Sequence, residues 1–79
     1  MKVEIRLFAT LRRLIPEMQE KGWVIVDVED GATIRHLMTQ FGIPMDETKV
    51  IMKNFRQAGP DESLSDGDRV AFIPAVGGG

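Results

Sequence analysis

One segment of the chain has the spacing of an amphipathic helix, and it limits the folds that the rest can adopt. Its apolar residues recur at positions i, i+3, i+4 and i+7, which line one face of a helix: Ile34, Leu37, Met38 and Phe41. Thr33 can cap the start of this helix, and Gly42, closely followed by Pro44, can end it. The sequence therefore predicts a helix over 34–41. Because a single amphipathic helix needs a single hydrophobic sheet face to cover, we expect an α+β fold.

Four other segments have the pattern of strands that would supply this sheet face. They span residues 2–8, 23–28, 50–55 and 69–74. The first alternates between apolar and charged residues, with Val3, Ile5 and Leu7 on one side of the strand. In the last, Val70 and Phe72 share one face. β-Branched residues and turn signals between the segments support the same assignment.

The connections between these strands complete the predicted fold. Residues 9–15 form a short extra helix with Thr10 as its N-cap, and a turn is centred on Asp66-Gly67. The first two strands are expected to be antiparallel neighbours, and the helix over 34–41 leads back to the sheet. The result is a mixed four- to five-stranded sheet covered by one main helix, an α+β roll of the β-grasp (ubiquitin-like) kind. Residues 1–76 would form this domain and 77–79 a flexible reactive tail.

Length and charge exclude several classes of protein. A chain of 79 residues makes one small domain, and its net charge of −2 argues against a nucleic-acid binder. No apolar run approaches the roughly 20 residues that a membrane span needs. The first residues alternate charged and apolar side chains, so no signal peptide is expected. A cytoplasmic location without membrane association is the default expectation.

The residue types that carry most catalytic chemistry are scarce. The sequence has no cysteine and one histidine, so neither a thiolate nucleophile nor a zinc site of the usual Cys/His type is expected. No phosphate-binding or nucleophile-elbow glycine pattern occurs either. Whether the chain counts as an enzyme stays open, since no self-contained active site is predicted. Two classes remain: a carrier or modifier that presents its own terminus, and a non-catalytic β-grasp interaction module with an inert tail.

Essentially the whole chain resembles a known family, most specifically near its C-terminus. Two stretches carry the resemblance, Leu64–Val70 and Pro74–Gly79. They are similar to the Leu-x-Asp-Gly-Asp-x-Val and terminal Pro-Pro-Val-x-Gly-Gly pattern of the MoaD/ThiS family of ubiquitin-like sulfur carriers. Ala75 stands where a second proline is usual, and Gly77 where a small non-glycine residue is common. Leu7–Arg12 also matches, with the Phe-Ala-x-x-Arg helix typical of the molybdopterin synthase small subunit, so that branch fits better than the thiamine carriers.

The resemblance implies a role for the last residues. In such carriers a partner E1-like adenylating enzyme uses ATP to adenylate the terminal carboxylate, here that of Gly79. A sulfur donor then converts it to a thiocarboxylate, which passes sulfur to a pterin precursor on the molybdopterin synthase large subunit, or to thiazole synthase in the thiamine case. The carrier itself would bind no cofactor and no metal. Gly77 and Gly78 would enter a channel in the partner, and Val76 would fix where the tail begins.

Partners must also grip the body of the domain. We expect this surface on the sheet face away from the helix, and strand parity over residues 50–55 assigns Lys53 and Phe55 to one face, with Ile73 nearby. The loop Asn54-Phe55-Arg56 differs from the Asn-Gly turn often seen in thiamine carriers. Other functions stay open: a thiamine-type or other biosynthetic sulfur carrier, or a prokaryotic ubiquitin-like modifier that forms isopeptide bonds through Gly79.

Overall fold

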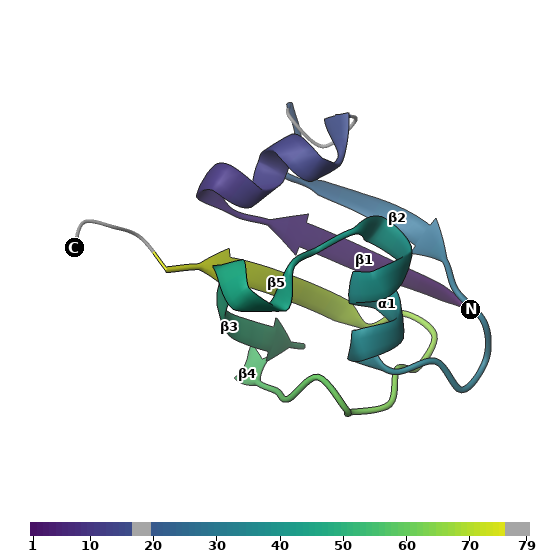
Figure 1. The fold of residues 1–79 in the computed structure, drawn as a ribbon. Coiled ribbons are helices and arrows are strands. Elements are labelled where there is room, and N and C mark those ends of the chain that lie inside the picture. The colour runs from purple at the N-terminus through teal and green to yellow at the C-terminus, as the bar shows by residue number, and fades with distance from the viewer. Residues whose placement is uncertain (17–19, 76–79) are drawn as a thin grey trace.

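The computed structural model describes residues 1–16 and 20–75 (Figure 1). Its elements in chain order are β1 Lys2–Leu7, the 3₁₀ helix η1 Ala9–Leu14, β2 Trp23–Asp27, α1 Ile34–Phe41, the 3₁₀ helix η3 Met45–Glu47, β3 Thr48–Lys53, β4 Arg56–Gln57 and β5 Arg69–Pro74. The expected α+β class is confirmed, with one main helix lying against a mixed sheet.

The sheet has five strands in the order β2-β1-β5-β3-β4. β1 and β5 are parallel, and the other neighbours are antiparallel, including the predicted β1–β2 pair. β5 therefore lies at the centre, although it is the last strand in the chain. Leu7 of β1 and Ile51 of β3 both pair with Phe72, which is fully buried. The segment that leads toward the C-terminus is thus anchored on both sides.

Helix α1 covers one face of the sheet, and its predicted bounds and caps are confirmed (Figure 1). The Thr33 hydroxyl accepts a hydrogen bond from the His36 N–H at 3.3 Å, and His36 Nδ1 accepts one from the Thr33 N–H at 3.0 Å. This reciprocal pair is a capping box, with a histidine in the place usually taken by glutamate or glutamine. Gly42 ends the helix in the left-handed conformation, with φ of 68°.

A single apolar core fills the space between α1 and the sheet. Its buried side chains come from β1, η1, α1, β3, β5 and several connecting segments: Val3, Ile5, Leu7, Leu11, Ile15, Val28, Ala32, Ile34, Leu37, Met38, Ile43, Ile51, Leu64, Val70 and Phe72. The strand alternation predicted for β1 and β5 is confirmed, since Val3, Ile5, Leu7, Val70 and Phe72 all point into this core.

The segment after β1 differs from the prediction. η1 is a 3₁₀ helix preceded by Phe8, without a side-chain cap, so the assignment of Thr10 as N-cap is wrong. The reason is that the chain stays with the sheet through Phe8, whose N–H donates to the Phe72 carbonyl at 3.3 Å. It then turns at Ala9, which has a positive φ of 50°.

The predicted third strand over residues 50–55 is shifted. β3 begins at Thr48 and ends at Lys53, and Asn54 and Phe55 form the turn into the short strand β4. Strand parity therefore does not extend to Phe55. Ile51 and Lys53 lie on the α1 side of the sheet, because they pair with the inward-facing Phe72 and Val70. The prediction that Lys53 shares the open face with Phe55 is wrong.

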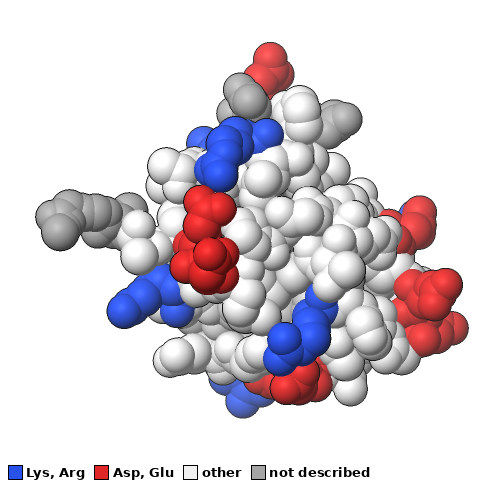
Figure 2. All heavy atoms as spheres, in the orientation of Figure 1, with Lys and Arg blue, Asp and Glu red and all other residues white. Residues whose placement is uncertain are grey.

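Figure 2 shows the face that carries α1. Uncharged side chains fill its centre, and Asp and Glu side chains lie in separate groups around it, including the side near the N-terminus. Among the described residues, no helix is both long and apolar enough to cross a membrane.

Candidate functional site

The residues predicted to react or to give access lie at the very end of the chain. Val76, Gly77, Gly78 and Gly79 are outside the described residues, as is the predicted boundary between domain and tail. The structure does describe the strand that leads to them. β5 ends at Pro74, which is buried and pairs with Thr48. The reactive end predicted from the sequence is therefore attached to the central strand of the sheet.

A two-residue turn next to the start of β5 carries the most exposed large apolar side chain of the described chain. Asn54 and Phe55 connect β3 to β4 with φ values of 52° and 70°. Positive φ at both central residues is typical of the tight hairpin turns that favour Asn-Gly. Here phenylalanine stands where glycine would be relaxed. Its side chain is 78% exposed, so the ring gains little from the core.

A hydrogen-bond network ties this turn to the start of β5. The backbone N–H of Asn54 donates to the Arg69 carbonyl at 2.8 Å, and Asn54 Oδ1 accepts from the Arg69 N–H at 2.9 Å. The Asn54 side-chain amide donates to Asp68 Oδ1 at 2.9 Å. The second oxygen of Asp68 accepts a hydrogen bond from the Ser65 N–H at 2.7 Å. Asp68 is only 8% exposed, so both oxygens of this buried carboxylate have partners within the protein. The predicted Asp-Gly-Asp turn thus also holds the Asn54-Phe55 turn in place.

Beside the turn lies a hollow of about 230 Å³ on the sheet face away from α1. We call it the Phe55 hollow; it is lined by Arg6, Phe8, Met52, Phe55, Arg69, Val70, Ala71 and Ile73. Most of its lining is apolar, and Phe55 and Ile73 come together here as the sequence suggested. Lys53 is absent from it: its ammonium group contacts the Ser63 carbonyl at 3.1 Å and Glu62 at 3.4 Å.

Two arginines stand at this hollow with unequal partners. Arg6 Nε lies 2.6 Å from Glu4 Oε2, whereas Arg69 Nε lies 4.0 Å from Glu4 Oε1. The guanidinium carbon of Arg69 is 5.8 Å from the centroid of the Phe55 ring, within the range of a cation–π contact. Glu4 is therefore engaged by Arg6, and Arg69 is held against the Phe55 ring with most of its donors available.

The lining residues missed from the sequence include Phe8 and Arg69. Phe8 is 38% exposed, and Arg69 is exposed as well. A signal was present for both. Phe8 continues the outward-facing positions of β1, and Arg69 alternates with the inward-facing Val70. What the sequence could not indicate is that the turn at Asn54 returns Phe55 to this same face.

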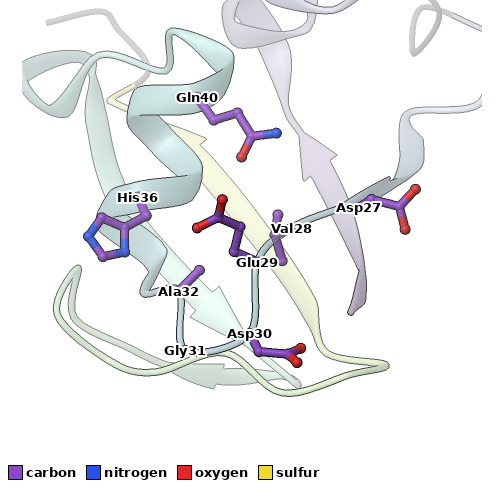
Figure 3. Close-up of a pocket in the computed structure, with 8 residues that line it drawn as sticks. All are labelled: Asp27, Val28, Glu29, Asp30, Gly31, Ala32, His36 and Gln40. Atoms are coloured by element: carbon purple, nitrogen blue, oxygen red, sulfur yellow. The ribbon is translucent and has the colours of Figure 1, made fainter.

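A second, wider hollow of about 720 Å³ lies between the β2–α1 loop and α1 (Figure 3). Two of its titratable groups are engaged elsewhere: Asp27 Oδ1 lies 2.7 Å from Lys2 Nζ, and His36 Nδ1 accepts a hydrogen bond from the Thr33 N–H. The contact with Lys2 holds the pKa of Asp27 below its usual value. In Figure 3 only Glu29 and Gln40 point toward one another. No group of three or more His, Cys, Asp or Glu side chains suited to a metal ion occurs within residues 1–16 and 20–75.

Comparisons with known proteins agree with the fold. The protein is similar to SAMP1 of Haloferax volcanii, with a TM-score of 0.75 and 24% identity over 100% of both chains. It is also similar to a putative molybdopterin converting factor, subunit 1, of Pyrococcus furiosus, with a TM-score of 0.74 and 27% identity over 96% of this chain and 99% of that one. A third similar structure is a chain of the complex of subunits 1 and 2 of molybdopterin-converting factor from Helicobacter pylori. Its TM-score is 0.60, and the sequence identity is 21% over 100% of both chains.

No curated protein matches the sequence significantly. A family model does: the Mut7-C ubiquitin family matches residues 1–77. Together with the similar structures, this match confirms the MoaD/ThiS-type, ubiquitin-like resemblance predicted from the C-terminal motif. The chain therefore belongs to the Mut7-C ubiquitin family and has its ubiquitin-like β-grasp fold.

Proposed function

We propose that this protein is a sulfur carrier for molybdopterin biosynthesis that acts through the carboxylate of Gly79. An E1-like partner enzyme transfers AMP from ATP to this carboxylate, with release of pyrophosphate. A sulfur donor then displaces AMP and leaves a thiocarboxylate. A free α-carboxylate has a pKa of roughly 3.3–3.7, so at neutral pH it is ionised and able to attack phosphorus. The chain needs no cofactor of its own, because the partner binds the ATP.

This proposal rests first on the match to a ubiquitin-like family over residues 1–77, which ends at the first of the three terminal glycines. It is supported by the 27% identity to the putative molybdopterin converting factor subunit of Pyrococcus furiosus. Gly77 and Gly78 lack side chains that would meet the walls of a narrow partner channel, and Val76 precedes them. Three extended residues reach at most roughly 10–11 Å, which suits entry into a buried active site.

We further propose that partners grip the domain at the Phe55 hollow. Ile73 belongs both to this hollow and to β5, which leads to the tail. A partner bound here would hold the strand from which the tail starts, and so would set the position of Gly79. Lys53 is left out of this surface, since it lies on the α1 side of the sheet.

The partners follow from the same assignment. The Helicobacter pylori structure is a complex of subunits 1 and 2 of molybdopterin-converting factor. We propose that a large subunit of molybdopterin synthase likewise accepts the tail of this chain and uses its sulfur. In a thiamine-type carrier, thiazole synthase would take that place. The adenylating enzyme and the sulfur donor complete the set.

A second function is favoured by the similarity to SAMP1, described as a small archaeal modifier protein, which extends over 100% of both chains. In that case the activated Gly79 would form an isopeptide bond with lysines of target proteins. Expressed with an affinity tag at its N-terminus, a modifier gives high-mass conjugates that vanish when Gly79 is deleted. A carrier gives a thiocarboxylate and no such conjugates.

The test of the carrier function is to incubate the purified chain with the adenylating enzyme, ATP and a sulfur donor. Intact-mass analysis should show a gain of about 16 Da, the difference between sulfur and oxygen, when the terminal carboxylate becomes a thiocarboxylate. Addition of the large synthase subunit and the pterin precursor should return the original mass. A chain that is never charged would instead support the interaction module with an inert tail.

A further inference from the structure

The two edges of the sheet differ in their protection against pairing with another chain. β4 forms one edge and is only two residues long, with the exposed polar side chains of Arg56 and Gln57. β2 forms the other edge, beside β1, and extends over five residues, Trp23–Asp27 (Figure 1). Short edge strands, charged side chains and proline are the usual devices against edge-to-edge pairing. β4 has the first two, whereas β2 has no proline and a single charged residue, at its last position.

The hydrogen bonds to β1 show which backbone groups of β2 point outward. Met1 and Val28 exchange two hydrogen bonds of 2.9 Å and so form a hydrogen-bonded pair of the antiparallel ladder. Such pairs occur at every second position, so the N–H and C=O groups of Val24 and Val26 also point to β1. In the part of the chain that the structure describes, no turn or loop backbone bonds to the intervening residues. The residues whose groups point outward are Trp23, Ile25 and Asp27.

The side chains of β2 suit contact with another strand on both faces of the sheet. Ile25 is 54% exposed on the face away from α1. Asp27 lies on the same face, and its carboxylate is 2.7 Å from Lys2 Nζ, which offsets the one charge of the strand. On the α1 side, Val24 and Val26 are partly buried at the border of the core. An approaching strand would therefore meet apolar side chains on both faces.

The outward-pointing groups are symmetric about Ile25. A two-fold axis beside Ile25 would pair β2 with β2 of a second copy in antiparallel orientation, with Ile25 opposite itself and Trp23 opposite Asp27. Each of these pairs is of the hydrogen-bonded kind, so every outward N–H and C=O group of the strand would have a partner. A second copy thus supplies a strand of the same length with donors and acceptors at the matching positions.

The side chains also match in this register. The two Ile25 side chains would lie next to each other on the open face, and Val24 would lie opposite Val26 on the α1 side. β-Branched pairs across two strands stabilise a sheet. Lys21 and Glu29 are two residues beyond the two ends of β2 and are exchanged by the same axis, so opposite charges meet there.

We propose that β2 is a self-association surface, which pairs with β2 of a second copy about a two-fold axis at Ile25 and joins the two sheets into one. A strand of five residues is much smaller than the roughly 20–30 residues a side of a standard interface, so the dimer is weak and depends on concentration. β1 separates β2 from β5, so the dimer leaves the strand that leads to the C-terminus uncovered. The inference therefore does not depend on the proposed function.

The first test follows the exchange of backbone amides with water by NMR, in the full chain, between about 20 μM and about 1 mM protein. The outward amides of Trp23, Ile25 and Asp27 should exchange fast in the monomer and about tenfold more slowly when nine molecules in ten are paired. The amides of Val24 and Val26 point to β1 and should not depend on concentration. Exchange of the outward amides that stays fast throughout would overturn the dimer and leave this edge to a strand of a different protein.

The second test uses charge at the two-fold axis. Ile25→Lys and Ile25→Glu each place like charges opposite each other and should keep the chain monomeric in analytical ultracentrifugation at concentrations where the wild-type chain associates. A mixture of the two variants should associate again, because opposite charges then meet. Gln57→Lys adds a charge to the β4 edge instead and should associate like the wild-type chain. Since the Ile25 side chain is largely exposed, all variants should melt within a few degrees of the wild-type chain.

The outcomes of the second test also decide the register. Wild-type association that persists in Ile25→Lys would show that another surface is responsible and would overturn the proposal. A mixture of Ile25→Lys and Ile25→Glu that stays monomeric would overturn the two-fold axis at Ile25. Association of the mixture, together with slower exchange of the outward amides in the wild-type chain, would support it.

Discussion

The carboxylate of Asp68 accepts a hydrogen bond from the side-chain amide of Asn54, with 2.9 Å between Oδ1 and Nδ2. The two residues are distant in the chain, at the start of β5 and in the β3–β4 turn. Through this contact the Asp-Gly-Asp motif, which first appears as a turn signal, also shapes the surface on the far side of the sheet. The contact makes the motif part of the candidate site.

Replacing Asp68 by alanine should destabilise the domain by about 1–3 kcal/mol. The buried carboxylate satisfies donors from Asn54 and Ser65, and its removal leaves them without these acceptors. Asp68→Asn keeps the shape of the side chain and one acceptor oxygen, so it should reduce the free energy of unfolding by less than Asp68→Ala does. Urea unfolding followed by fluorescence of Trp23 measures both. Asp46→Ala is the control, because Asp46 is exposed and its replacement should change the free energy of unfolding by less than about 0.5 kcal/mol.

The capping box of α1 gives a second prediction. Thr33→Ala removes the acceptor for the His36 N–H and should reduce the free energy of unfolding by about 1 kcal/mol. His36→Glu restores the usual capping-box residue and adds a negative charge near the helix N-terminus, so it should be neutral or stabilising by about 0.5 kcal/mol. Thr39→Ala, on the exposed side of the same helix, is the control for helix propensity. A clear loss of stability in His36→Glu would show that the imidazole does more than cap.

The decrease in the free energy of unfolding at acid pH should depend in part on Glu62. Its carboxylate accepts from the Gly59 N–H at 2.9 Å, and this bond, followed by Lys53, lowers the pKa of Glu62 below its ordinary value of 4.5. The stabilisation is therefore present above that value and is lost as the pH falls through the lowered folded-state pKa. Urea unfolding between pH 7 and pH 3 should show a shallower decline for Glu62→Gln than for the wild-type chain. Glu29→Gln removes the same charge from the β2–α1 loop and should leave the slope as it is.

Helix α1 was predictable residue by residue, because its signals are local. The apolar stripe, the Thr33 cap and the Gly42 stop all lie within ten residues of one another and agree. The inward faces of β1 and β5 were predictable for the same reason, since alternation of apolar residues sets which side is buried. The parallel pairing of β1 with β5 is non-local and left no sign in either strand.

The candidate site was predictable only in part, because the β3–β4 turn has an unusual residue. Phenylalanine after asparagine gives no turn signal, so the pattern suggested a strand that continues to Phe55. In a strand that continues to Phe55, Lys53 and Phe55 would point to the same side. This prediction placed Lys53 on the open face of the sheet, whereas it lies on the α1 side. Phe55 and Ile73 nevertheless meet, since the turn reverses the chain onto the open face. The strain is visible only in the backbone angles.

In the proposed function, Gly79 is the reactive group and the rest of the chain positions it. Deletion of Gly78 and Gly79 should leave the free energy of unfolding within about 0.5 kcal/mol of the wild-type value. The reason is that the buried core residues of the described chain all precede Pro74. The same deletion should abolish sulfur transfer. A large loss of stability would contradict the division between folded domain and reactive tail.

The most direct measurement is the intact mass of the chain after incubation with the adenylating enzyme, ATP and a sulfur donor. The proposed carrier function predicts a gain of about 16 Da, located by fragmentation at Gly79 and absent from the chain that lacks Gly78 and Gly79. An unchanged mass in the wild-type chain, with an enzyme that charges another carrier in the same assay, would contradict it.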